Sequence, residues 1–382
     1  MDQSKNYYWR IAGFYFFYYA FIGMFAPYWS LYLQSLHFNM VDISILMSVQ
    51  PMMRMLAPNL WGWLADHTGN RRKIVIIAAS LSAIFYLGLF MTSSFWGMLA
   101  ALALMSFFWS ASMPLVEATT LSYLGAHTAH YGRLRSWGSI GFIFSVSCLG
   151  YALDYIAISW LLWAGLLCEL GILLFSCQMP GTPVLAHHTD HHSIRKILFQ
   201  PAVLVLFVAC FLMSAAHGPY YTFFSIYLVE HGYSKTAVGG LWALGVICEI
   251  AVFFWMPALT RRYDLTSILK VSLAIAVVRF SLIGWCVDSL LLLLVAQVMH
   301  AATFGAYHAA SVGRVHEIFK GRHQAKGQAL FGSLTYGAGG ILGGLFSGPV
   351  WKYLGAGSLY TCSAAMALLG LILMGWNKSR SS

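Results

Sequence analysis

Twelve long apolar segments follow one another along the 382-residue chain, and they limit the possible folds more than any other feature of the sequence. About 20 apolar residues in a helix cross the hydrocarbon core of a bilayer, and continuous apolar runs favour helices over the alternating strands of a membrane barrel. The sequence therefore predicts an all-α integral membrane protein with twelve transmembrane helices. The predicted spans are residues 9–34, 42–66, 73–92, 96–123, 131–155, 157–178, 202–230, 236–260, 266–286, 289–316, 325–351 and 356–376.

The composition agrees with a membrane protein. Only 9% of the residues are charged and 59% are apolar, whereas a water-soluble domain carries about 25% charged residues. The net charge of +10 would suggest nucleic acid for a soluble protein, but here the basic residues fall in loops and no nucleic-acid partner is expected. The seven cysteines lie in apolar stretches without a CxxC pair, so we expect no disulfide, metal site or cofactor.

The distribution of lysine and arginine predicts the orientation of the chain. With the N-terminus inside, eighteen of these residues lie at or near the cytoplasmic side, and only Lys235 and Lys352 lie outside. Basic loops stay in the cytoplasm. We therefore expect a multi-pass protein of the cytoplasmic (inner) membrane with both termini in the cytoplasm.

A polar segment divides the chain into two halves of six spans each. We predict an N-terminal six-helix bundle at residues 1–179, a cytoplasmic linker at 180–200 and a C-terminal six-helix bundle at 201–382. The histidine-rich run within the linker is interpreted as polar linker rather than as a metal site. The motifs YWSLYL and FFSIYL, which close spans one and seven, lie 195 residues apart. Such a parallel repeat is typical of transporters whose two bundles rock about a central site.

The loop between spans two and three contains the motif Gly62-Trp63-Leu64-Ala65-Asp66-His67-Thr68-Gly69-Asn70-Arg71-Arg72-Lys73. It resembles the G-x-L-a-D-r-x-G-r-r/k signature that the major facilitator superfamily has in the same loop. The resemblance implies the major facilitator fold, with two pseudo-symmetric six-helix bundles and alternating access, and gating roles for Gly62, Asp66, Gly69 and Arg72. Gly62 is expected to allow close helix packing. The corresponding loop of the second half, residues 257–264, lacks the Gly-x-x-x-Asp core.

Ionisable side chains inside spans cost about 2.5–3.5 kcal/mol each, so every one is a candidate for function. The charged candidates are Arg54, Glu117, Arg135, Glu169, Glu249 and Arg279. Glu117 and Arg135 can meet across the short loop between spans four and five. Their spacing of 18 and the G-R-x-R-x-x-G-x-x-G surround resemble the lactose permease family, which implies a substrate-binding or coupling role. The alternative is an ion pair that only pins two helices.

Four polar residues of the second half share a depth in the membrane. His217, Glu249, Arg279 and His300 lie roughly 11 to 15 residues into their spans, and at 1.5 Å per residue this places them near the midplane, where transporters bind substrates. We expect Glu249, His300 and Arg279 to couple transport to protons. Arg279 and His300 also resemble the proton site of the lactose permease family, although Thr303 stands where that family has an acid. Each histidine has the alternative role of a satisfied interhelical hydrogen-bond partner.

Several stretches resemble the phenylpropionate permease family within this superfamily. They are Phe16-Phe17-Tyr18-Tyr19, Ala216-His217-Gly218-Pro219-Tyr220-Tyr221, Gly240-Leu241-Trp242-Ala243-Leu244-Gly245 with Glu249, and His300-x-x-Thr303-Phe304-x-x-x-His308. The resemblance implies uptake of a small aromatic carboxylate, such as 3-phenylpropionate, together with protons. The candidate substrate-binding residues are Glu117, Arg135, Arg54, His217, Trp242 and Tyr220. For most of the aromatic candidates, a lipid-facing or interfacial position is the interpretation that we favour.

The sequence thus predicts a secondary active transporter, a proton symporter that imports a small organic solute, and not an enzyme. Its expected partners are a small-molecule substrate, protons and the lipid bilayer. The absence of a G-x-x-x-x-G-K-[ST] motif argues against an ATP-driven pump. The alternatives are a sugar or nucleoside proton symporter, a proton-coupled drug exporter and a non-transporting membrane receptor. Overlapping G-x-x-x-G pairs at 339–348 predict packing within one chain rather than a dimer face, so we expect a monomer.

Overall fold

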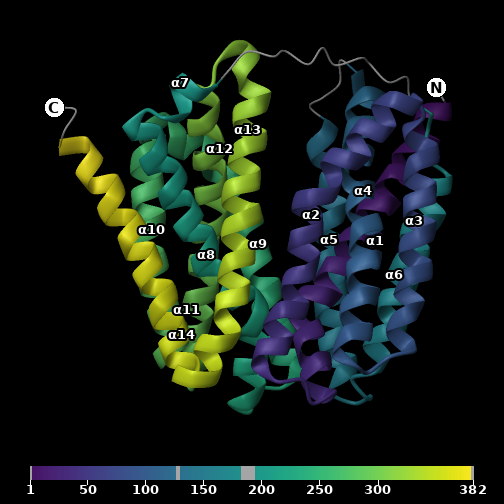
Figure 1. Ribbon diagram of the computed structural model, residues 1–382, viewed down its shortest axis with the longest axis horizontal. Coiled ribbons are helices and arrows are strands. Elements are labelled where there is room, and N and C mark those ends of the chain that lie inside the picture. The colour runs from purple at the N-terminus through teal and green to yellow at the C-terminus, as the bar shows by residue number, and fades with distance from the viewer. Residues whose placement is uncertain (1, 126–129, 182–193, 380–382) are drawn as a thin grey trace. The chain divides into compact units, whose positions relative to one another are not determined.

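The computed structural model describes residues 2–125, 130–181 and 194–379, and every regular element in these ranges is a helix (Figure 1). The predicted all-α architecture is therefore confirmed. The helices group into two compact units. The first unit comprises Met1–His188 with Ser234–Gly239, and the second comprises Thr189–Tyr233 with Gly240–Ser382.

Six long helices make up most of the first unit. They are α1 (Asp2–Ser35), α2 (Met40–Thr68), α3 (Arg71–Leu87), α4 (Phe95–Leu124), α5 (Tyr131–Leu153) and α6 (Trp160–Cys177). The second unit begins with the short α7 (Arg195–Leu198) and continues with α8 (Pro201–Glu230), α9 (Lys235–Arg262), α10 (Leu265–Trp285), α11 (Leu290–His300), α12 (Tyr307–Ile318), α13 (Gln324–Gly332) and α14 (Gly340–Ser379). The start of α9 belongs to the first unit.

Eleven helices of the described residues are long and apolar enough to cross a membrane. The last of them runs for 51 residues from Lys326 to Trp376, about twice the length that one crossing requires. Gly355 divides it, because its backbone is non-helical (φ 79°, ψ 170°) and only glycine adopts such a positive φ without strain. With this division the predicted count of twelve spans is confirmed.

Two spans of the second unit contain a π-helical segment. Ala301–Ala306 joins α11 to α12, and Ser333–Gly339 joins α13 to α14. Such wider turns shift the following side chains around the helix axis and are frequent at functional sites. Both segments carry polar side chains. Thr303 of the first segment contacts Arg279, and Tyr336 of the second contacts His308.

The same offset separates corresponding helix ends in the two units. α1 ends at Ser35 and α8 at Glu230, and α4 begins at Phe95 and α11 at Leu290. Each pair is 195 residues apart, which is the offset of the YWSLYL and FFSIYL motifs. The repeat therefore extends from short motifs to whole helices.

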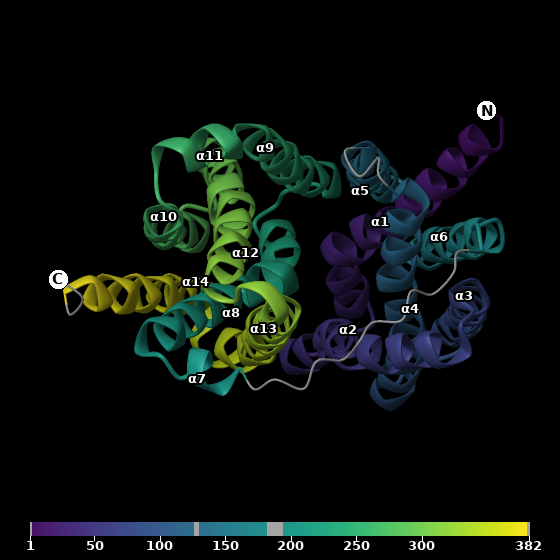
Figure 2. The same ribbon diagram turned by 90° about the horizontal axis from the view of Figure 1, so that it is seen from above.

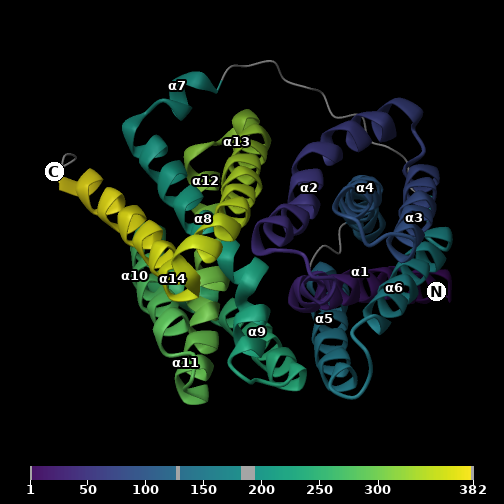
Figure 3. The same cartoon turned by 60° about the horizontal axis from the view of Figure 1, so that its bottom comes forward.

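Glycines set the closest helix contacts inside each unit. In the first unit α1 packs against α5 and α6 (Figure 2), and a Cβ at Gly141 of α5 would lie well inside 3.0 Å of the Phe16 carbonyl oxygen. In the second unit α14 packs against α8 and α10 (Figure 3), and a Cβ at Gly343 would meet the Ala215 carbonyl oxygen in the same way. The G-x-x-x-G glycines thus pack against α8 of the same chain, as predicted.

Candidate functional site

Glu117 and Arg135 of the first unit are both half-buried, but they do not form the ion pair that was the alternative to a substrate-binding or coupling role. Tyr131 donates a hydrogen bond to Oε1 of Glu117 at 3.1 Å. Arg135 instead donates to the hydroxyl of Tyr19, and its guanidinium carbon lies 4.0 Å from the centre of the Tyr19 ring. Among the described residues, the prediction of a direct contact is therefore wrong, because each charged group is held by a tyrosine.

Arg54 lies beside an aromatic wall in the same unit. Its side chain is exposed, and its guanidinium carbon is 5.9 Å from the centre of the Trp109 ring. Trp109 in turn stacks on Tyr18, with ring centres 4.2 Å apart and an interplanar angle of 11°. The first unit therefore presents two arginines next to aromatic rings, a combination that suits a ligand with both a negative charge and an aromatic ring.

Arg279 is the centre of a polar cluster in the second unit. It is 0% exposed, and its Nε donates to the Ala296 carbonyl oxygen at 3.0 Å. Its Nη1 lies 3.3 Å from Oγ1 of Thr303 and 3.3 Å from Nε2 of His217. Thr303, the residue that replaces the expected acid, thus binds the arginine through its hydroxyl.

The hydrogen bonds of His217 identify its tautomer. Its Nδ1 lies 2.8 Å from the Met213 carbonyl oxygen, which only accepts, so Nδ1 carries the proton. Arg279 only donates, so Nε2 of His217 accepts from it and carries no proton. His217 is therefore neutral in this arrangement and orients Arg279. The alternative interpretation as a satisfied interhelical histidine describes its geometry correctly.

Aromatic side chains enclose Arg279. Its guanidinium carbon is 4.4 Å from the centre of the Tyr220 ring, which lies 4.9 Å from Trp242 and 5.6 Å from His300. Tyr220 and Trp242 are both buried, so the lipid-facing interpretation is wrong for these two aromatic candidates. It is also wrong for Tyr18, which is buried, while Tyr19 and Tyr221 are half-buried. These rings pack between helices of their own unit, because each contacts a charged or aromatic neighbour there.

Glu249 and His300 approach each other at the edge of this cluster. Oε2 of Glu249 is 4.0 Å from Nε2 of His300, and the two side chains are 19% and 6% exposed. This distance is longer than a hydrogen bond, so a small movement of either side chain is needed before a proton can pass between them. Of the three predicted proton-coupling residues, Glu249 has the most exposed side chain, since Arg279 is 0% exposed.

Three buried nitrogen atoms around Tyr220 have no hydrogen-bond partner among the described residues. They are Nη2 of Arg279, Nε2 of Gln297 and Nδ1 of His300. Gln297 is oriented by Tyr220, whose hydroxyl donates to its Oε1 at 2.9 Å. Nη2 of Arg279 and Nε2 of Gln297 are donors, and an unsatisfied buried donor costs about 1–3 kcal/mol. A ligand with acceptor oxygens would satisfy them, so this cluster has the chemistry of an anion site.

Sequence reasoning missed Gln297 and Tyr131, and it named Tyr19 only among the aromatic candidates and not as the partner of Arg135. Gln297 was detectable, because a glutamine in an apolar span one helical turn before His300 lies on the same helix face. The bond between Arg135 and Tyr19 was not detectable, since the first span alone contains five tyrosines between residues 9 and 34. His308 is a further member near the cluster, and its Nδ1 lies 2.8 Å from the hydroxyl of Tyr336 in the second π-helical segment.

The motif at residues 62–73 runs from the last turns of α2 through the turn at Gly69 into α3. Gly69 ends α2 with a left-handed backbone (φ 65°), and Arg72 donates to the Cys177 carbonyl oxygen at the end of α6 at 2.7 Å. Within the first unit a Cβ at Gly62 would meet no atom within 4 Å, so the predicted close helix packing at Gly62 is wrong there. The side chain of Asp66 and the histidine run at 187–192 lie outside the described part of the chain.

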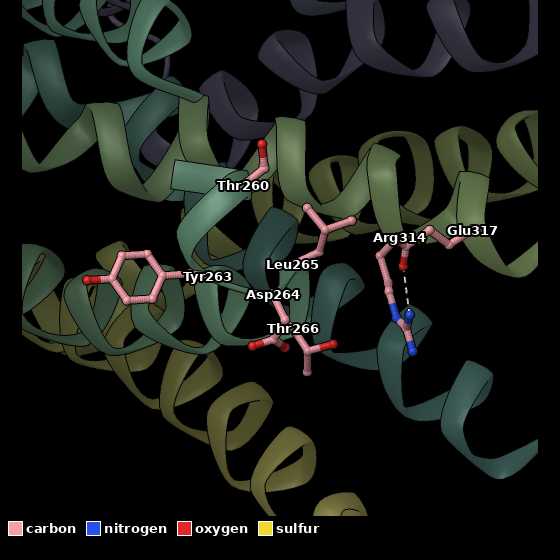
Figure 4. Close-up of a pocket in the computed structure, with 7 residues that line it drawn as sticks. All are labelled: Thr260, Tyr263, Asp264, Leu265, Thr266, Arg314 and Glu317. Carbon is pink, nitrogen blue, oxygen red and sulfur yellow. Dashed lines mark hydrogen bonds and ion pairs between the residues drawn. The ribbon is translucent and has the colours of Figure 1, made fainter. Parts of the chain in front are cut away.

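A cavity of about 370 Å³ lies where the α9–α10 loop meets α12 (Figure 4). It is lined by Thr260, Tyr263, Asp264, Leu265, Thr266, Arg314 and Glu317. Arg314 pairs with Glu317 at 2.8 Å, and Asp264 caps α10 by accepting from the Ser267 amide at 3.1 Å. Its charged groups are already paired or used as caps, so it lacks the unsatisfied donors of the Arg279 cluster.

Comparisons with a family model and with individual proteins agree that this chain resembles membrane transporters. The family model described as "MFS_1 like family" matches residues 8–362. The "Probable 3-phenylpropionic acid transporter" of Escherichia coli (strain K12) is 28% identical over 376 residues, which cover 96% of this chain and 96% of that protein. The "Maltose permease" of Geobacillus stearothermophilus is 23% identical over 364 residues, or 94% of this chain and 92% of that protein.

Solved structures share the same fold. A crystal structure of a mutant of the nucleoside transporter NupG superposes with a TM-score of 0.87 over 96% of this chain and 98% of that chain, at 17% identity. The crystal structure of the human organic anion transporter MFSD10 (TETRAN) has a TM-score of 0.66 over 98% of this chain, at 18% identity. Likeness at this level of identity concerns the arrangement of the helices.

Proposed function

Because the chain belongs to the MFS_1 like family and is a multi-pass membrane transporter of the major facilitator type, we propose that it imports a small aromatic carboxylate together with protons. 3-Phenylpropionate is our preferred substrate. The E. coli relative named for 3-phenylpropionic acid matches nearly the whole chain, although at only 28% identity. The chemistry of the side chains therefore has to carry the proposal.

The observation that carries it is the buried guanidinium of Arg279. Its contacts are a neutral histidine, a threonine hydroxyl, a backbone carbonyl and two aromatic rings, and none of these has a negative charge. A carboxylate would offer its oxygens to Nη2 of Arg279 and to Nε2 of Gln297. The rings of Tyr220 and Trp242 would lie against an aromatic group of the same ligand.

The first unit supplies further binding groups in this proposal. Arg135 and Arg54 lie beside Tyr19 and Trp109, and they attract the anion before it is enclosed. Glu117, which accepts a hydrogen bond from Tyr131, is a further candidate binding group of this unit. Alternating access of the two bundles exposes the buried cluster of the second unit in one state and closes it in the other.

Proton coupling is assigned to Glu249 and His300. A proton on Glu249 removes its charge beside His300, and this changes the contact between α9 and α11. Arg279 links this event to the substrate, because it is bound to His217 and lies against the same Tyr220 ring as His300. Loading and protonation would then favour the same reorientation of the carrier.

Sugar or nucleoside symport is the second candidate, and the name of the maltose permease relative favours it. A neutral ligand would leave the charge of Arg279 uncompensated, so we prefer the carboxylate. We also propose that both termini are cytoplasmic, that the membrane is the inner membrane, that the chain acts as a monomer and that residues 180–200 link the two bundles.

The test is uptake of labelled 3-phenylpropionate into proteoliposomes with and without an inward proton gradient. We expect gradient-dependent accumulation in the wild type, a loss of at least tenfold in Arg279→Gln and in Arg135→Ala, and full activity in Arg314→Ala, which removes an arginine from the helix-end pair with Glu317. No uptake by the wild type would refute the substrate, and a panel of sugars, nucleosides and drugs would then distinguish the remaining candidates. Ligand binding without flux would indicate a receptor.

A further inference from the structure

Glu169 is a buried carboxyl that the proposed mechanism does not use. It is the tenth residue of the 18-residue helix α6, so it lies about 14 Å from the helix start and near the middle of the span. Its side chain is 0% exposed. Neither of its oxygens has a hydrogen-bond partner among the described residues.

The groups that face Glu169 come from every helix packed on α6. α3 contributes Ser82 and Tyr86, α1 contributes Tyr18, and α6 itself contributes Cys168. Ser82 directs its hydroxyl to the Met105 carbonyl oxygen at 3.4 Å, and Tyr86 donates to the Leu162 carbonyl oxygen at 3.1 Å. None of these four facing groups carries a positive charge, so the carboxyl has no counter-ion among the described residues that face it.

A carboxylate in such surroundings is among the costliest groups in a protein, and binding one proton removes its charge. The folded protein would be more stable with an apolar residue of similar volume at this position than with a carboxyl that never ionises. The presence of glutamate therefore indicates a role that requires both protonation states.

From this arrangement we propose that Glu169 is a proton-binding site of the first unit, separate from Glu249 and His300, and that it gains and loses a proton in each transport cycle. The inference rests on the proposed function, since it assumes a proton-coupled carrier. Its structural effect follows from the tight packing of α6. Side chains at Gly165 and Gly171 would clash with Tyr86 and Phe17, so α6 has little room to adjust when the charge beside it changes.

A sodium ion is the less suitable ligand for this carboxyl. Hard cations take six or more oxygen ligands, and among the described residues the only other side-chain oxygens facing the carboxyl belong to Ser82, Tyr86 and Tyr18. A proton needs only one acceptor. Sodium-driven uptake is therefore an outcome that would count against the proposal.

The first experiment compares Glu169→Gln with the wild type in proteoliposomes. We expect exchange of labelled for unlabelled substrate at equal pH to stay within about twofold, and uphill accumulation on a proton gradient to fall at least tenfold. Ser176→Ala is the matched control, because Ser176 is also buried on α6 but bonds only the Ile172 carbonyl oxygen. Uphill accumulation in Glu169→Gln equal to the wild type, or accumulation in the wild type driven by sodium alone, would overturn the proposal.

The second experiment needs neither a substrate nor a variant at Glu169. In a Glu117→Gln, Glu249→Gln protein, Glu169 is the remaining acid of the three predicted inside spans. We expect infrared spectra near pH 6 to show the C=O absorption of a protonated carboxyl, when exposed carboxyls with a pKa of about 4 are ionised, and the absorption to disappear at higher pH. Its absence near pH 6, or its persistence to pH 10, would refute proton exchange at Glu169. Either result leaves the assignment of substrate untouched.

Discussion

Nη1 of Arg279 lies 3.3 Å from Nε2 of His217, and the 2.8 Å contact of His217 Nδ1 with the Met213 carbonyl oxygen makes this histidine neutral. The arrangement holds a buried cation in place without neutralising it. Since no carboxylate is among its contacts in the described part of the chain, the positive charge is available to an anionic ligand. The predictions for the second unit follow from this relationship.

Replacement of Arg279 is expected to remove the preference for a carboxylate. In the wild type, 3-phenylpropionate should bind at least tenfold more tightly than its uncharged amide, which corresponds to about 1.4 kcal/mol. In Arg279→Gln this preference should disappear. Arg279→Lys should recover little of it, because an ammonium cannot reproduce the bonds to Ala296 and Thr303 together. Competition with labelled substrate gives both affinities, and an unchanged ratio in Arg279→Gln would place the carboxylate elsewhere.

Loss of His217 should lower the stability of the folded protein and not only its rate of transport. His217→Leu leaves Nη1 of Arg279 with one acceptor fewer in a buried position, so we expect the free energy of unfolding to fall by about 1–3 kcal/mol. The melting temperature of the purified protein measures this. His231→Leu is the control, because His231 makes the same Nδ1 contact to a carbonyl four residues earlier, at 2.8 Å, but is exposed. Equal melting of the two variants would contradict the role of His217.

Glu249→Gln should separate transport from proton coupling. The amide keeps the size of the side chain but neither carries a charge nor exchanges a proton, so exchange of substrate across the membrane should continue while uphill accumulation is lost at least tenfold. His300→Gln should have a smaller effect, because the contact of 4.0 Å makes His300 a neighbour of the carrier group rather than its partner. Uphill uptake that survives in both Glu249→Gln and Glu117→Gln would remove the proton-coupling assignment.

The amino-acid sequence predicts the fold well because the bilayer imposes a simple rule on it. Apolar length alone gives twelve spans, and the YWSLYL and FFSIYL motifs give the 195-residue offset that the ends of α1 and α8 repeat. The π-helical segments are not visible in this way. A wider turn changes neither the length nor the hydropathy of a span, so these two criteria cannot detect it.

Side-chain pairing is harder to predict than depth. Arg279, His217 and His300 share a depth that helix length gives directly, and the structure brings them around Tyr220. Glu117 and Arg135 also share a depth, yet Tyr131 and Tyr19 hold them apart. A charged residue in apolar surroundings takes the nearest polar partner on any neighbouring helix, and in a chain that is 16% aromatic this partner is often a tyrosine.

A substitution at Gly141 should disrupt the first unit, whereas the same change at Gly62 should not. The Cβ of Gly141→Ala would collide with the Phe16 backbone, which cannot move away without displacing α1. We expect a loss of about 1–3 kcal/mol in the free energy of unfolding. Gly62→Ala meets no atom within 4 Å in its own unit and should keep the wild-type melting temperature. A stable Gly141→Ala would mean that α1 and α5 are not in contact there.

Asp154 should make the stability depend on pH in the acidic range. Its partial burial acts to raise its pKa, but bonds from the Thr236 hydroxyl and amide and from the Lys235 amide, at 2.6–2.9 Å, lower the pKa below its ordinary value of 3.8. Since the folded pKa is below the unfolded one, this carboxylate stabilises the protein fully above about pH 4, and the contribution is lost as the pH falls through the folded value.

The melting temperatures of the wild type and Asp154→Asn should therefore differ at pH 7 and 5, and the difference should shrink progressively once the pH falls below the ordinary value of 3.8. The difference measures the bonds that the charged oxygens accept at the start of α9. Asp288→Asn removes an exposed carboxylate from another loop and controls for the general effect of charge. If the gap between the wild type and Asp154→Asn stayed constant from pH 7 to pH 3, the carboxylate would not titrate as the hydrogen bonds require, and the cap on α9 would depend on shape rather than on charge.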